Sequence, residues 1–399
     1  MSVPQLEQRA GVYHLTWKDE QIVARVDRLH TERAGVYGEL LLRTTIPAGP
    51  SHLHGPVHFN FISTSARAQL VRHLHTVIEA NWTALLEQTC YLVVEGHRKG
   101  NPAIHIPDHT MPDALGMRIN PIIAEKQPTL FFGEGDSLKS FFATYVAVIT
   151  CLGIPHAGLT PEPGRVLYLD YETDIDTFWE RVHLITTGLD KPLPEGLFYR
   201  HMVEPVAAEF PRLNTIVSEQ DISLVVVDSA APATLEPENA EVVTSFFASL
   251  RALGPTSLVI AHMTKVAKGD YPFGSSFWRH LPRSNFHIRA DRNQDDVAIV
   301  LRHTKSNNGK RLQPLGFKFH FEPDSVTVER VSPADYDDLK DTLPVWQRIA
   351  IALKNGQMDS RAIAEEIGIS DNNVRAVLSR YQDQHFVKMG NQWGRLLKP

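Results

Sequence analysis

Four short apolar runs recur after residue 128, and polar or charged residues follow each of them before the next helical stretch begins. The runs are LFF at 130–132, VLYLD at 166–170, LVVVD at 224–228 and SLVIAH at 257–262. Strands that are apolar on both faces are buried on both, so runs alternating with helices predict an α/β core with a mainly parallel sheet. Ligands bind at the carboxyl ends of such strands, which makes the residues after each run the first functional candidates.

A glycine-containing turn follows the first run and leads into a helix that starts with Lys139 and Ser140. In a phosphate-binding loop (P-loop), backbone N–H groups cradle the phosphates, the lysine contacts the outer phosphates and the serine hydroxyl binds magnesium. Such loops usually have glycine directly before the lysine, where this chain has Leu138; an ordinary strand-to-helix turn is the alternative. The residues expected to bind ATP are Gly133, Glu134, Gly135, Asp136, Ser137, Leu138, Lys139 and Ser140.

The other three runs lead to side chains suited to a bound nucleotide. Glu172 follows the second run, where a carboxylate facing the γ-phosphate would act as the base that orients water. Asp228 ends the third run in the form of a Walker B acid, which predicts Mg²⁺ binding together with Ser140. His262 ends the fourth and would sense the γ-phosphate. The alternatives are a helix-capping aspartate and a hydrogen-bonded core histidine.

Four sequence blocks, in this order, resemble the RecA-fold ATPases of the RepA type, the ring-forming plasmid helicases, and related phage ATPases. The blocks are GEGDSLKS, LYLDYETDIDTFWERV, LVVVDSA, and VIAHMTKVAKG followed by FGSSFWRHLPRSNFHI. The resemblance covers roughly residues 129–310. It implies a RecA-like P-loop ATPase that assembles with itself, as a hexameric ring with ATP sites between subunits.

The same resemblance implies a catalytic arginine that acts on the nucleotide of the neighbouring subunit. Arg283, in the segment GSSFWRHLPR, matches that position. A guanidinium there would neutralise charge that develops in the transition state. Arg279 and Arg302 are rivals for this role, Lys305 is a candidate second cation, and a solvated surface arginine is the alternative.

The rest of the chain divides around this core. We expect an N-terminal α+β domain at 1–106, the ATPase core at 107–331, a linker at 332–344 and a winged-helix domain at 345–399. In the N-terminal part, 22–29 and 37–44 have strand patterns and 66–78 a helical one. The histidines at 52, 54 and 58 are interpreted as a polar turn rather than a metal site.

Two regions have residues suited to DNA. Lys265 and Lys268 lie in the loop after His262, where cations and aromatic residues suit single-stranded DNA, although a plain connection is the alternative. In the predicted winged helix, Asp371 is expected to cap the second helix of a helix-turn-helix. Its candidate groove residues are Asn373, Arg375 and Arg380, together with Asn372 and Ser379. A winged helix used for protein contact is the alternative.

Composition restricts the setting. The net charge of −6 argues against a histone-like polycation, and two cysteines exclude a disulfide framework or a Cys-based metal site. No apolar run approaches the roughly 20 residues of a membrane span, so we expect a cytoplasmic protein. The sequence predicts an ATP- and Mg²⁺-dependent DNA-binding motor, a RepA-like helicase or translocase. The alternatives are an ATP-switched DNA-binding regulator or loader, and a non-hydrolysing core.

Overall fold

The computed structural model describes residues 2–9, 11–33, 35–47, 50–100, 103–106, 110, 116–263, 271–293 and 296–396. The chain divides into two compact units. The first comprises Met1–Ala114 with Phe210–Glu219, and the second comprises Leu115–Glu209 with Gln220–Pro399. None of the helices within the described ranges has the length and apolar character needed to cross a membrane.

The first unit contains a five-stranded antiparallel sheet and two helices, as the α+β prediction requires. Ser63 caps the first helix by accepting a hydrogen bond from the Ala66 amide, and Asn81 caps the second in the same way. The segment 52–58 is part of an edge strand rather than the predicted polar turn. Its elements are β1 (Gln5–Arg9), β2 (Val12–Trp17), β3 (Ile22–Glu32), β4 (Gly35–Thr44), β5 (His52–Asn60), α1 (Thr64–Leu74) and α2 (Trp82–Lys99).

That edge strand was misread because only one of its faces is buried. Leu53 and Phe59 point into the core of the first unit, whereas His52, Val57 and His58 are exposed. The apolar signal is therefore sparse and interrupted by Gly and Pro. No metal-binding group of His, Cys, Asp and Glu occurs among the residues whose placement is described.

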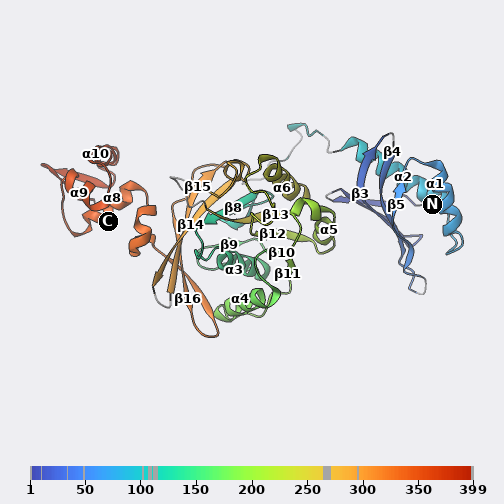
Figure 1. Cartoon of the computed structure of the whole chain (residues 1–399), viewed down its shortest axis with the longest axis horizontal. Helices are drawn as coiled ribbons and strands as arrows, with labels where there is room; N and C mark the ends of the chain where they lie inside the picture. Colours follow the sequence, from blue (N-terminus) through green and yellow to red (C-terminus); the bar gives the residue numbers. More distant parts are fainter. Residues whose placement is uncertain are drawn as a thin grey trace. The chain divides into compact units, whose positions relative to one another are not determined.

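A nine-stranded sheet forms the centre of the second unit (Figure 1). Five neighbouring pairs are parallel and the last three are antiparallel. The order across the sheet is β11 (Leu197–His201), β10 (Arg165–Asp170), β12 (Ile222–Asp228), β13 (Thr256–His262), β8 (Pro128–Gly133), β14 (Ser284–Asn293), β15 (Asp296–Ser306), β16 (Leu315–Phe321) and β17 (Val326–Val331).

Both faces of the parallel strands are covered, which explains their unbroken apolar runs. On β8, Phe131 faces one side while Leu130 and Phe132 face the other, and all three are fully buried. Figure 1 shows the helices placed around the sheet. They are α3 (Lys139–Leu152), α4 (Ile175–Gly188) and α6 (Ala240–Leu253). The chain between β11 and β14 also contains α5 (Val206–Glu219) and the short α7 (Phe277–His280).

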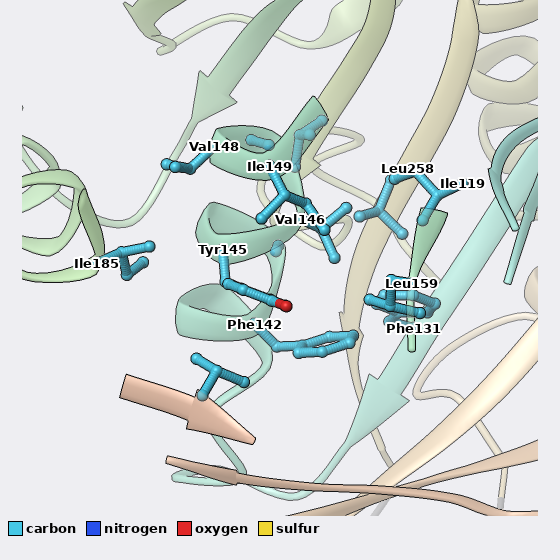
Figure 2. Packing of buried hydrophobic residues seen from close by; sticks show 14 of the residues in the cluster. Ile119, Phe131, Phe142, Tyr145, Val146, Val148, Ile149, Leu159, Ile185 and Leu258 are labelled. Carbon is cyan, nitrogen blue, oxygen red and sulfur yellow. The ribbon is translucent and has the colours of Figure 1, made fainter. Parts of the chain in front are cut away.

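Helix α3 is the central piece of the largest core cluster (Figure 2). Its residues 142–150 are all buried, and Phe142 and Tyr145 pack toward strand residues such as Phe131. A small sheet of β6 (Met117–Asn120), β7 (Ile123–Ala124) and β9 (Thr160–Pro161) adds Ile119 to the same cluster. A helix buried on all sides cannot shift easily, so the loop at its start is held firmly.

The segment 332–344, predicted as a linker, contains two short 3-10 helices, η2 (Pro333–Asp335) and η3 (Asp337–Thr342). Leu339 is fully buried against Ala298 and Val300 of β15. Arg289 of β14 also makes two hydrogen bonds to the Asp341 carboxylate, at 2.5 and 2.6 Å. The connector between the sheet and the C-terminal helices is therefore packed on the sheet.

The C-terminal segment has three α-helices followed by a β-hairpin among its described residues. Val374 and Leu378 of the third helix are buried in a small core with Trp393 of the hairpin. Gly390 makes the hairpin turn with φ of 61°. The elements are α8 (Val345–Ala352), the 3-10 helix η4 (Leu353–Asn355), α9 (Ser360–Ile367), α10 (Asp371–Arg380), β18 (Phe386–Met389) and β19 (Gln392–Arg395).

Candidate nucleotide site

The carboxyl ends of the parallel strands lie level with one another. Asp170 is in register with Asp228 on the neighbouring strand, and His262 is in register with Gly133. The side chains that the sequence singled out after each run are therefore brought to one edge of the sheet. We call Lys139, Ser140, Glu172, Asp228 and His262 the phosphate edge.

The loop after β8 is held close to the next strand and includes two non-glycine residues in the left-handed region. A Cβ atom at Gly133 would lie 2.3 Å from the carbonyl oxygen of Ile288, so this position requires glycine. Asp136 has φ of 61°, and Leu138, the residue just before α3, has φ of 55° and ψ of 22°. Leu138 thus adopts a conformation that favours glycine, at a cost of about 1–2 kcal/mol.

The Leu138 side chain explains how the chain accommodates that cost. It packs, partly buried, against the large core cluster around α3. Burial of an aliphatic side chain contributes a stabilisation of about 1.5–3 kcal/mol when complete, which offsets the backbone penalty. The leucine therefore changes how the loop is held without changing its path.

Lys139 lies inside the loop with only 5% of its surface exposed. Its Nζ donates to the Glu134 carbonyl oxygen at 2.5 Å and to Ser137 Oγ at 3.1 Å. Burial lowers the pKa of the ammonium, while the nearby carboxylates, first Asp228 and then Glu172, oppose that shift. The loop thus encloses a desolvated ammonium group that donates to a carbonyl and a hydroxyl oxygen of the loop itself. Such a loop is suited to bind phosphate.

Asp228 is 2% exposed at the end of β12. Its Oδ2 accepts a 2.7 Å hydrogen bond from the Tyr168 hydroxyl. Burial raises the pKa of Asp228 to about 6, although the Tyr168 and Ser140 side chains act to lower it. Its Oδ1 is buried and has no hydrogen-bond partner among the described residues. A buried carboxylate oxygen beside a serine hydroxyl fits the oxygen ligands that Mg²⁺ prefers.

Glu172 is positioned by the turn that precedes it. The buried Asp170 carboxylate accepts hydrogen bonds from the Glu172 amide at 2.9 Å and the Thr173 amide at 3.0 Å. The Glu172 carboxylate accepts from the Ser229 hydroxyl and lies 3.2 Å from His262 Nε2. The hydrogen bond from His262 lowers the pKa of Glu172 more than burial raises it, so the group stays ionised near neutral pH. Sequence reasoning found Glu172 and His262 but missed Asp170 and Ser229 as their supports.

Strand β14 places two arginines at the same loop, and sequence reasoning missed both. Arg289 and Arg292 line a cavity of about 430 Å³ whose other wall is the loop from Glu134 to Ser137. Arg292 Nη2 donates to the carbonyl oxygen of Asp136. The basic residues of IRADRN were a signal, but the segment was not recognised as a strand next to β8.

Arg283 lies at the opposite end of the strands. Its amide donates to the carbonyl oxygen of Pro128, the first residue of β8, whereas Gly133 is the last. At about 3.3 Å per residue these ends are roughly 16 Å apart, farther than an arginine side chain extends. Arg283 is exposed and is therefore directed away from the nucleotide loop of its own chain.

Three further cations surround Arg283. Arg251 and Lys305 each have a pKa lowered mainly by burial and further by Arg283. Lys305 Nζ donates to the carbonyl oxygens of His280 and Pro282, both at 2.5 Å, so it holds the backbone just before Arg283. Arg279, which also lowers the pKa of Lys305, stacks over the Tyr271 ring at 4.8 Å. The group Arg251, Arg279, Arg283 and Lys305 is called the cationic edge.

No carboxylate in the described part of the chain forms an ion pair with a member of the cationic edge. Arg302, the remaining rival, is exposed on β15. Lys305, the candidate second cation, donates two hydrogen bonds to the backbone of the loop of residues 280–282. An unneutralised group of cations is a favourable site for an anion.

The residues predicted to contact DNA lie only partly within the described part of the chain. Lys265 and Lys268 lie outside the described residues. Asn373 and Arg380 are exposed on α10, on the side away from buried Val374. Arg375 is also exposed, but it pairs with Asp371 at 2.6 Å and donates to Ser360 Oγ at 3.1 Å. Asp371 is thus an ion-pair partner within the first turn and not the expected cap, a position that Ser370 occupies.

Comparison with known proteins finds one domain match and similar solved structures. Residues 108–268 match the family model of an AAA domain. Among solved structures, a KaiC-like protein from Pyrococcus horikoshii OT3 is 12% identical, with a TM-score of 0.41 over 54% of this chain and 99% of that one. The flagellar accessory protein FlaH from Methanocaldococcus jannaschii is 13% identical, with a TM-score of 0.39 over 53% and 92%. No curated protein matches the chain significantly. The domain match, the loop and the strand order together support a RecA-like P-loop ATPase core in the central region.

Proposed function

We propose that the protein hydrolyses ATP with Mg²⁺ at the phosphate edge and uses the energy to act on DNA. One observation carries the hydrolytic part of the proposal. The ends of four parallel strands bring a caged lysine, two ionisable acids and a histidine to one edge, next to a loop shaped for phosphate. These are the parts that phosphoryl transfer needs for positioning and charge stabilisation.

Each residue of the phosphate edge has a role in this proposal. Lys139 and the loop amides hold the outer phosphates. Lys139 Nζ then donates to phosphate oxygens in place of Glu134 and Ser137. Ser140 and Asp228 hold Mg²⁺, which supplies charge neutralisation when bound. Glu172, kept ionised, orients the attacking water, and the hydrogen bond to His262 reports whether the γ-phosphate is present.

We further propose that the site is completed by Arg283 of a neighbouring copy. Arg283 lies at the far end of the strands from its own loop, with unneutralised cations around it. A head-to-tail contact would bring the cationic edge of one copy to the phosphate edge of the next. Such heterologous contacts close into rings when the rotation allows it, as the proposed hexameric ring requires.

The proposal that the assembly is a DNA motor of the helicase or translocase type is supported by the C-terminal segment. Helices α9 and α10 with the hairpin β18–β19 have the order of a winged helix, and Asn373 and Arg380 present exposed polar groups. In such domains the second helix of the pair enters the major groove. The channel-loop candidates Lys265 and Lys268 stay predictions.

A second candidate function is a DNA-binding regulator or loader that ATP switches without translocation. The observation that favours it is the pair in which Arg289 Nη1 donates to both carboxylate oxygens of Asp341. Arg289 lines the nucleotide cavity, and Asp341 lies in the connector that leads to the C-terminal helices. A nucleotide that attracts Arg289 would weaken this pair and change how the C-terminal segment is held.

The two functions predict different results with the purified full-length chain. We expect ATP turnover that single-stranded DNA increases, a larger mass in solution with nucleotide, and ATP-dependent strand displacement. Turnover and assembly without strand displacement would favour the regulator. Absence of any ATP turnover, with Mg²⁺ and either form of DNA present, would overturn the proposed hydrolysis.

A further inference from the structure

Tyr168 is a fully buried tyrosine in the middle of β10, a run that otherwise consists of apolar residues up to Asp170. Its hydroxyl donates to Asp228 Oδ2 at 2.7 Å and lies 3.5 Å from the carbonyl oxygen of Ser140. One phenol therefore touches both proposed metal-binding positions. A phenylalanine would fill the same space without reaching either of them.

The hydroxyl is held in place and remains a donor. The Tyr168 ring packs on Phe178 with centroids 4.5 Å apart. A donor held by ring packing in this way fixes the rotation of the carboxyl group that accepts from it.

The consequence lies in the other carboxyl oxygen. Tyr168 donates to Oδ2 of Asp228, and Oδ1 of the same carboxylate is buried without a hydrogen-bond partner among the described residues. The Ser140 side chain lies near this carboxylate. Leaving a buried acceptor unpaired is unfavourable. A cation that binds between Asp228 and Ser140 would remove that penalty without any rearrangement of Tyr168.

We infer that Tyr168 is a positioning residue for the metal ion: its hydroxyl ties Oδ2 of Asp228 so that Oδ1 is presented, together with Ser140, to Mg²⁺. This inference rests on the proposed function, because it concerns the same site. It assigns to the middle of a buried strand a part in metal binding that neither the sequence pattern nor the domain match indicates.

Tyr168→Phe in the full-length chain tests the inference, and Tyr145→Phe is the matched control. Tyr145 is equally buried in the same core, but its hydroxyl pairs with His156 Nδ1 at 2.8 Å, away from the metal-binding positions. Mn²⁺ binding in the presence of ADP is measured by electron paramagnetic resonance of the free ion. We expect the Mn²⁺ dissociation constant to rise about tenfold for Tyr168→Phe. The control variant should keep the wild-type value, and metal-free ADP binding should be unchanged in both.

A double-mutant cycle with Asp228→Asn separates positioning from general support of the fold. If Tyr168 acts through Asp228, Tyr168→Phe should cause no further loss of Mn²⁺ affinity in the Asp228→Asn background. A loss of the same size in both backgrounds would overturn the inference, as would Tyr168→Phe with wild-type Mn²⁺ affinity. Wild-type protein that binds ADP with no dependence on Mn²⁺ would remove the proposed function as well.

Discussion

The two ends of the parallel strands differ in charge and in how their side chains are held. At the phosphate edge, Lys139 and Asp228 are buried, and hydrogen bonds fix the acids in place. At the cationic edge, Arg279 and Arg283 are exposed, and no described carboxylate pairs with them. One edge has its polar groups fixed by hydrogen bonds, and the other presents cations that no described carboxylate pairs with. Under the proposed function, each edge is half of a site shared between two copies.

Lys139→Ala has the largest expected effect, because it removes the one cation inside the loop. The proposal predicts that ATP turnover falls to background and that nucleotide binding weakens. Steady-state phosphate release and fluorescent ATP titration measure the two quantities. Lys191→Ala, at an exposed lysine after α4, is the control and should behave as wild type. Unchanged ATP turnover in Lys139→Ala would show that the phosphate edge is not the site of hydrolysis.

Arg283→Ala should lower turnover about 10³-fold while leaving ATP affinity unchanged, because the guanidinium acts on the transition state of another copy. Separate measurements of kcat and of ATP binding test this split. Arg279→Ala and Arg302→Ala are the comparison variants and should have smaller effects. If either of them exceeds Arg283→Ala, the catalytic arginine has been assigned to the wrong residue.

Lys305→Met should lower turnover about tenfold, less than Arg283→Ala, because Lys305 positions the backbone before Arg283 and does not act on phosphate itself. In the Arg283→Ala background the same change should have almost no further effect on turnover. Equal and additive losses would indicate that Lys305 acts directly, as the sequence first suggested.

Two buried titratable groups, His303 and Asp228, should change the stability in opposite directions with pH. His303 of β15, close to Lys305, is buried, stacks on Phe286 and accepts from the Leu312 amide. Burial lowers its pKa to about 4 from 6.5, so stability is lost as the pH falls from 6.5 through 4, by up to about 3 kcal/mol. The raised pKa of Asp228 acts in the other direction, because its contribution is lost as the pH rises from 3.8 through about 6.

His303→Gln keeps an acceptor for the Leu312 amide but cannot gain a proton. The difference in Tm between His303→Gln and wild type, measured by circular dichroism, should therefore become more favourable to the variant as the pH is lowered from 6.5 to 4.5. A difference in Tm that is the same at both pH values would show that His303 does not titrate in this range.

Leu138→Gly has the smallest expected effect. Glycine removes the left-handed backbone cost of about 1–2 kcal/mol, but the change also removes a partly buried side chain from the core around α3. The two terms nearly cancel, so Tm and ATP affinity should stay close to wild type. A gain in affinity of tenfold, about 1.4 kcal/mol, would mean that the leucine restricts the loop in its binding conformation.

The sequence predicted the parallel strands because their apolar runs are buried on both faces. LFF, VLYLD, LVVVD and SLVIAH all lie in central strands, and the residues after them converge on one edge. Position at a strand end was therefore enough to find Glu172, Asp228 and His262. The hydrogen-bond partner Tyr168 was hidden because a buried tyrosine inside an apolar run has the pattern of ordinary core.

Strands with mixed burial could not be recognised from pattern alone. β14 has buried polar residues, Asn285, His287 and Asp291, among its apolar ones, so neither alternation nor an apolar run marks it. Missing β14 meant missing Arg289 and Arg292 beside the nucleotide loop. β11 is an edge strand with no fully buried residue, and its pattern is equally weak. Long-range pairing, rather than local pattern, determines both strands.

Mixing two inactive variants tests whether the site is shared between copies. Lys139→Ala disables the phosphate edge, and Arg283→Ala disables the cationic edge. When the two variants are mixed in equal amounts and assemble at random, two intact edges meet at roughly a quarter of the contacts between copies. If the site is shared between copies, the mixture should hydrolyse ATP at a substantial fraction of the wild-type rate, whereas each variant alone should not. A mixture as inactive as its components, with mixed assembly shown by mass, would contradict a site shared between copies.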